Sequence, residues 1–145
     1  MFMNFIRNQE NIEELDDNFW NEVFKIINKA LNLKDKTPSL ISKTLLLLSM
    51  IYFPKQAANV DKLAPINHIN DNFEEFKSEK EFIASSLRCL TAITGDNIQN
   101  SNETVNSKLI VKLKDQILAI NKGENQDILL YLTLLYNSLI KNNNE

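Results

Sequence analysis

The decapeptide TLLLLSMIYF, residues 44–53, is the most apolar stretch of this chain, and its burial decides the fold. A membrane-spanning helix needs about 20 consecutive apolar residues, but the apolar run from Ser39 is shorter and contains Lys43. Pro54 ends the run, because a prolyl ring cannot continue the helical hydrogen-bond ladder. The stretch therefore predicts a helix that starts near Ser39, a residue able to cap its amides, and forms the buried central helix of a soluble fold.

Composition supports a single all-helical domain over residues 1–145. The chain has 145 residues, a length typical of one domain. Hydrophobic residues make up 43% and charged residues 24% of it, which is ordinary globular usage. Only 2 glycines and 3 prolines are present, whereas folds rich in β-turns need many of these residues. The net charge of −3 offers no electrostatic basis for binding nucleic acid or an anionic membrane.

The remaining chain carries apolar residues at steps of three and four, the pattern of amphipathic helices. In residues 12–33 the expected stripe is Ile12, Leu15, Phe19, Val23, Ile26 and Ala30. Further helices are predicted over residues 80–94, 104–120 and 125–141. The stripe of the helix over residues 104–120 starts at Val105. The stripe of the helix over residues 125–141 is Ile128, Leu132, Leu135 and Leu139. Between residues 56 and 76, Pro65 indicates one or two short helices and a loop through INHINDN, residues 66–72.

One pattern recurs in three of these helices. Ile-x-x-x-Leu-x-x-Leu begins at Ile41, Ile83 and Ile128, at intervals of 42 and 45 residues. HEAT and armadillo units repeat every ~40–47 residues, and residues 39–142 resemble an armadillo/HEAT-like helical repeat, although the glycine usual between an armadillo unit's first two helices is absent. The resemblance implies a short helical stack. A compact bundle of five to seven helices is the alternative.

Residues able to carry chemistry are few. His68 and Cys89 are the only histidine and cysteine, too few for a structural zinc site, and with two glycines there is no phosphate-binding loop. We expect no metal, no cofactor and no catalytic residue, with Cys89 in the core. Lys108 and Lys112 are four apart with Lys114 nearby, and we interpret them as a solvated face. The acidic pair Glu74–Glu75 is interpreted in the same way.

Two groups of residues are candidates for a protein interface. Trp20 and Phe24 form a second apolar stripe beside Phe19, and tryptophan is enriched among interface hot spots. The C-terminal helix is apolar around most of its circumference, so Leu130, Tyr131 and Leu134 are expected to face a second copy or another partner. A two-fold homodimer is the simplest such arrangement.

These observations predict a non-enzymatic helical interaction module that binds a protein or peptide partner. The alternative is a small acidic inhibitor or immunity-type protein that occludes a toxin or an enzyme. The N-terminal residues contain too short an apolar run for a secretory signal. We therefore expect a cytoplasmic protein with no membrane and no nucleic-acid partner.

Overall fold

The computed structural model describes residues 17–51, 64–95, 98–119 and 126–143. These ranges contain helices and no strand, which confirms the prediction of an all-α fold. The helices are α3 (Asp17–Leu31), α4 (Pro38–Ile51), α5 (Ala64–Phe76), α6 (Lys80–Thr94), α7 (Ile98–Asn106), α8 (Leu109–Ala119) and α9 (Gln126–Asn143). None of these helices is both long and apolar enough to cross a bilayer.

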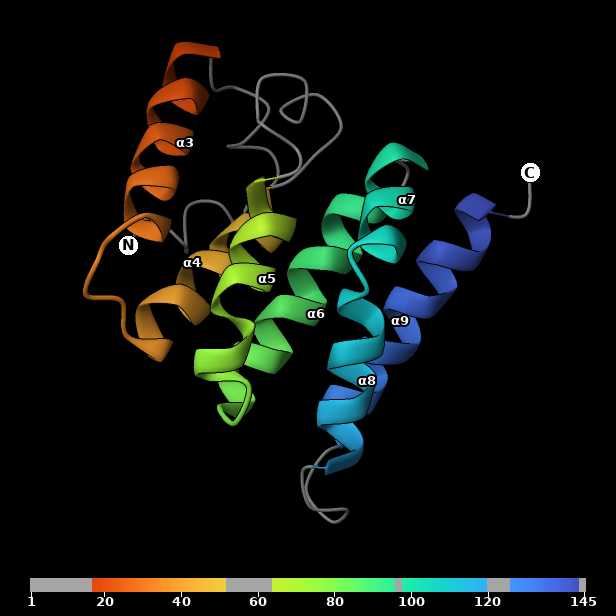
Figure 1. Cartoon of the computed structure of the whole chain (residues 1–145). Helices are drawn as coiled ribbons and strands as arrows, with labels where there is room; N and C mark the ends of the chain where they lie inside the picture. Colours follow the sequence, from red (N-terminus) through yellow and green to blue (C-terminus); the bar gives the residue numbers. More distant parts are fainter. Residues whose placement is uncertain (1–16, 52–63, 96–97, 120–125, 144–145) are drawn as a thin grey trace.

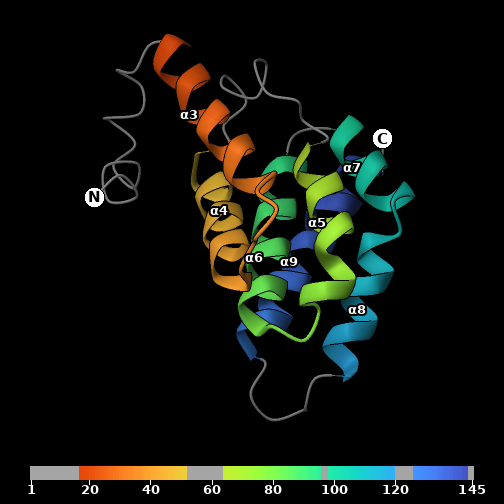
Figure 2. The same ribbon diagram turned by 60° about the vertical axis from the view of Figure 1, so that its left-hand side comes forward.

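The long helices alternate in direction along the chain (Figures 1 and 2). Helices α4, α6 and α9 lie side by side and run the same way, whereas α3, α5 and α8 run the opposite way. Helix α6 packs against both α4 and α9, and α5 and α8 contact α6 and α9 respectively. Buried residues of α3, α4, α5, α6, α8 and α9 belong to one hydrophobic cluster.

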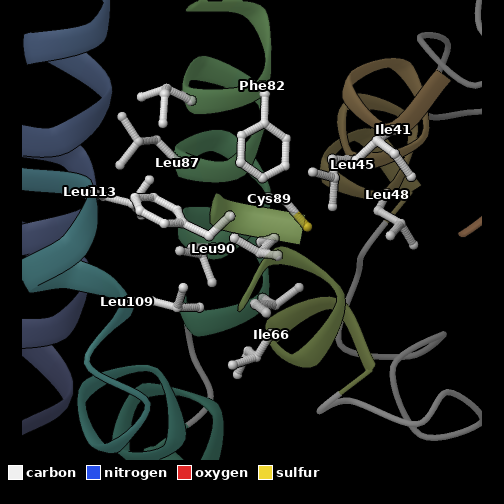
Figure 3. Packing of buried hydrophobic residues seen from close by; sticks show 14 of the residues in the cluster. Ile41, Leu45, Leu48, Ile66, Phe82, Leu87, Cys89, Leu90, Leu109 and Leu113 are labelled. Carbon is white, nitrogen blue, oxygen red and sulfur yellow. The ribbon is translucent and has the colours of Figure 1, made fainter. Parts of the chain in front are cut away.

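The recurring pattern supplies the centre of this cluster. All three of its residues in each of α4, α6 and α9 are buried, namely Ile41, Leu45, Leu48, Ile83, Leu87, Leu90, Ile128, Leu132 and Leu135. Figure 3 shows part of this packing, with Leu87 and Leu90 of α6 between α4 on one side and Leu109 and Leu113 of α8 on the other. The predicted apolar stripes of residues 80–94 and 125–141 are thus confirmed.

Helix α4 starts as the sequence indicates but is not the central helix. The main-chain amide of Leu40 donates to Thr37 Oγ1 at 3.1 Å, so Thr37, not Ser39, caps the helix. Pro38 follows at the first helical position, where a missing N–H costs nothing. Leu46 and Leu47 are only half-buried. The expectation of a central α4 was wrong: α6 takes that place, with contacts to α4, α5, α7 and α9.

Residues 66–72 are helical and do not form the expected loop. They lie inside α5, whose second residue is Pro65, so the proline opens a helix instead of splitting one. Ile66, Ile69 and Phe73 recur at steps of three and four and are all buried. The asparagines of this segment lower helix propensity, but burial of the apolar stripe overrides that preference.

The helix expected over residues 104–120 is interrupted. Helix α7 ends at Asn106, α8 begins at Leu109, and Lys108 between them has a φ of 60°. Ser107 Oγ donates to the Thr104 carbonyl oxygen at 2.8 Å and so supports the turn. Leu109 is buried as expected, but Val105 is exposed. The interruption rotates α7 so that Ser101 and Thr104, not Val105, face the interior.

Helix α3 buries a different face from the expected one. Val23 is buried as expected, but Ile26 is 68% exposed and Phe24 is only 5% exposed. The core side of the helix is Val23, Phe24, Ile27 and Leu31. The ring of Phe24, which the sequence suggested for a partner contact, packs in the core of its own chain. Ile12 and Leu15 lie outside the described residues.

Candidate functional site

Helix α9 combines a buried stripe with an exposed apolar face. Ile128, Leu132, Leu135 and Leu139 anchor one side of the helix in the core. One carboxylate, Asp127, lies in its first turn and Lys141 in its last turn, which is the arrangement that the helix dipole favours. The helix is thus held firmly along one side while its other side remains available for contact.

Leu130 and Leu134 lie on that outward side. They are 56% and 44% exposed, respectively, and their spacing of four residues places them on adjacent turns of one face. Solvation of two neighbouring leucines is unfavourable by roughly 25 cal/mol for each Å² of apolar surface. The structure therefore leaves two large apolar side chains on the surface of adjacent turns.

Tyr131 lies at the edge of this face, next to α6. It is half-buried and packs against the core cluster. The Arg88 guanidinium carbon lies 5.4 Å from the centre of its ring, a cation–π contact between α6 and α9. Tyr131 is thus partly engaged within its own chain, and it borders the Leu130–Leu134 face without being fully available to a partner. The side chain of Trp20 lies outside the described residues.

Cys89 is positioned as a core residue. Its side chain is fully buried, and its sulfur points from α6 toward Leu45 and Leu48 of α4 (Figure 3). Burial raises the pKa of the thiol to about 12, because the apolar surroundings disfavour the thiolate. A nucleophilic cysteine needs exposure and a lowered pKa, and Cys89 has neither.

The lysines noted in the sequence do not form one basic face. Lys112 Nζ donates to Asn70 Oδ1 of α5 at 2.7 Å and lies 5.7 Å from the centre of the Phe73 ring. Lys108 is at the turn before α8, and Lys114 Nζ lies 3.7 Å from an oxygen of Asp115. The ammonium group of Lys112 therefore links α8 to α5.

The polar residues of α5 have local roles. His68 is half-buried within the helix, and its main-chain carbonyl oxygen accepts a hydrogen bond from Asn72 Nδ2 at 2.7 Å. Glu74 accepts a hydrogen bond from Lys77 Nζ at 2.6 Å, and this contact lowers the pKa of the carboxyl group. Within the described ranges, no three or more His, Cys, Asp or Glu side chains are grouped so that they could hold a metal ion.

No protein-family model matches this chain, and no curated protein or solved structure is significantly similar to it. Function is therefore inferred from its own residues. The fold of the described residues places the protein in the all-α class. Among the described residues, α9 carries four exposed large apolar side chains, those of Leu129, Leu130, Leu134 and Ile140.

Proposed function

We propose that this chain is a non-enzymatic helical interaction module that binds a protein partner through the outward face of α9. The observation that carries this proposal is the exposure of Leu130 and Leu134 on a helix whose opposite stripe is buried. Two leucines one turn apart on a firmly anchored helix present a preformed apolar surface. Such a surface binds without the entropic cost of ordering a flexible segment.

The available chemistry supports a binding role over catalysis. Cys89, the strongest nucleophile by residue type, is buried with its pKa raised. His68 lies in the middle of a packed helix, and Lys112 is bonded to Asn70. Each of these side chains is thus accounted for by packing or by bonds within the chain.

The arrangement of helices supports the finer proposal of a short armadillo/HEAT-like stack. Helices α4, α6 and α9 share the Ile-x-x-x-Leu-x-x-Leu pattern, lie in one row and run in the same direction. Repeat proteins stack equivalent helices in this way, and their exposed faces serve as binding surfaces. In this proposal α9 is the equivalent of α4 and α6 in the last unit, and the protein acts in the cytosol.

Affinity capture from the cells that express the protein tests the proposed function. The bait is compared with a variant carrying both Leu130→Glu and Leu134→Glu, and with Ile26→Glu as the matched control. Ile26 is 68% exposed on α3 and tests whether any exposed apolar residue has the same effect. We expect the α9 variant to lose the captured protein and the Ile26→Glu variant to retain it.

Two outcomes would replace the proposal. Equal capture by all three baits would show that α9 is not the binding surface. Capture of a single toxin or enzyme whose activity is blocked would instead support the alternative of a small acidic inhibitor, which the net charge of −3 favours.

A further inference from the structure

The outward face of α9 carries a regular series of residues at alternating steps of three and four. The series is Asp127, Leu130, Leu134, Asn137 and Lys141, which we call the α9 seam, and all five residues are exposed. Steps of three and four give the average period of 3.5 at which two helices can pack along their whole length. The seam runs nearly the full length of α9, whose 18 residues span about 27 Å.

Charge is distributed symmetrically along this seam. Asp127 lies seven residues before Leu134 and Lys141 lies seven residues after it. An acid and a base at equal distances from a central leucine make the two charged ends of the seam complementary when one copy is reversed. A parallel copy would bring Asp127 next to another Asp127 and Lys141 next to another Lys141, which is repulsive at both ends.

From this symmetry we infer that the partner of the α9 seam is a second copy of the chain, bound antiparallel about a two-fold axis at Leu134. The inference rests on the proposed use of α9 as a binding surface and names its occupant. In this arrangement Asp127 of each copy lies opposite Lys141 of the other, and the two Leu134 side chains meet on the axis. The opposed helix dipoles of an antiparallel pair favour the same orientation.

The seam also predicts the strength of the dimer. Each copy contributes two exposed leucines, while Asn137 lies near Leu130 of the other copy and adds a polar side chain that lowers stability. A single helix pair of this length is small for a protein interface. We expect a dissociation constant of about 1–100 µM.

Sedimentation equilibrium of the whole chain with charge variants tests the orientation. Asp127→Lys and Lys141→Glu should each weaken dimerisation by about tenfold, because each turns two attractive pairs into two repulsive ones. The double variant restores opposite charges at both ends of an antiparallel pair, so its dissociation constant should return to near that of the wild type. A double variant as weak as the single variants would overturn the antiparallel pairing.

Disulfide trapping tests the position of the axis. Leu134→Cys places two cysteines together on the axis, so oxidation should give a covalent dimer under conditions in which the native Cys89 is buried and unreactive. Ile26→Cys is the matched control and should remain monomeric. Circular dichroism of each variant confirms that the helices are retained. Failure of Leu134→Cys to cross-link above the level of Ile26→Cys would overturn the inference.

The outcomes also separate this inference from the proposed function. A wild type that stays monomeric up to about 200 µM, above the expected dissociation constant, overturns the second-copy pairing. In that case, α9-dependent capture of a different protein would leave the proposed function intact. If neither pairing nor α9-dependent capture is found, both are overturned.

Discussion

The side-chain amide of Asn142 on α9 donates a hydrogen bond to the main-chain carbonyl oxygen of Thr94 in the last turn of α6. The same amide nitrogen donates to Ser101 Oγ of α7 at 2.7 Å. Ser138 Oγ lies 3.2 Å from Thr94 Oγ1 and adds a second link between α6 and α9. The carbonyl groups at a helix end lack partners within the helix, so α9 satisfies the end of α6 while holding α7 in place.

Replacing Asn142 by alanine should lower the free energy of unfolding by about 1–2 kcal/mol. The substitution leaves the Thr94 carbonyl and the buried Ser101 hydroxyl without this donor. Urea denaturation measures the change. Asn102→Ala, at an exposed position of α7, is the control and should change stability by less than about 0.5 kcal/mol. Equal effects of the two substitutions would show that the Asn142 contacts do not stabilise the fold.

Adjacent leucines of α4 should differ sharply in their contributions. Leu45 is fully buried, and Leu45→Ala should cost about 2–5 kcal/mol, the range for a core leucine. Leu46 is half-buried, so Leu46→Ala should cost about half as much or less. Chemical denaturation of both variants checks this order. A larger loss at Leu46 would contradict the orientation of α4.

Alanine at Ser86 should stabilise the protein. The hydroxyls of Ser42 and Ser86 are buried without a hydrogen-bond partner among the described residues. Removing a desolvated hydroxyl with no partner should raise the free energy of unfolding by about 1 kcal/mol. Thermal denaturation should show a higher midpoint for Ser86→Ala.

Thr94→Val is the control for this prediction, because it removes a buried hydroxyl that does have a hydrogen-bond partner. Thr94 Oγ1 donates to the Leu90 carbonyl oxygen at 2.7 Å, so its loss should destabilise the protein. If both substitutions destabilise, the Ser86 hydroxyl has a favourable contact and the prediction is wrong.

Cys89 should be protected in the folded protein and should make stability depend on alkaline pH. Its pKa is about 12 in the folded state, against 9.0 for an unperturbed thiol. Between these values the unfolded chain has lost the proton and the folded chain retains it, so stability falls as pH rises. A thiol reagent at pH 8 should react with Cys89 only after denaturant is added.

The variant Cys89→Ala isolates the contribution of the thiol. Its stability should fall less steeply than that of the wild type between pH 9 and pH 12. Identical slopes, or rapid labelling of the native wild type, would contradict the burial of Cys89.

Local patterns were sufficient to predict an all-helical chain, several of its helices and much of its core. The spacing Ile-x-x-x-Leu-x-x-Leu places three residues on one face of any α-helix, and in α4, α6 and α9 that face is the buried one. The same reasoning identified Cys89 as a core residue. It worked because residues at this spacing return to the same side of a helix at every turn.

The α9 face could be read only in part from the sequence. The width of the apolar surface pointed to Leu130 and Leu134, and the structure leaves both exposed. The contact of Tyr131 with Arg88 depends on where α6 lies, 43 residues earlier in the chain, and no local pattern contains it. Helical spacing places Asp127 and Lys141 on the same face. Only the tertiary structure shows that this face is exposed.

Tertiary structure decided the questions that local pattern left balanced. Four consecutive leucines, residues 45–48, surround a helix on every side, and only the packing of α6 against α4 selects Leu45 and Leu48 for the core. In α3, Phe24 and Ile26 both belong to plausible apolar stripes, and the position of the neighbouring helices determines which is buried. Burial of the Ile66, Ile69 and Phe73 stripe likewise makes a helix of an asparagine-rich segment. The sequence determined that helices form and which have a dominant face, because those properties are local; the choice between competing faces depends on burial against distant residues, which only the assembled fold supplies.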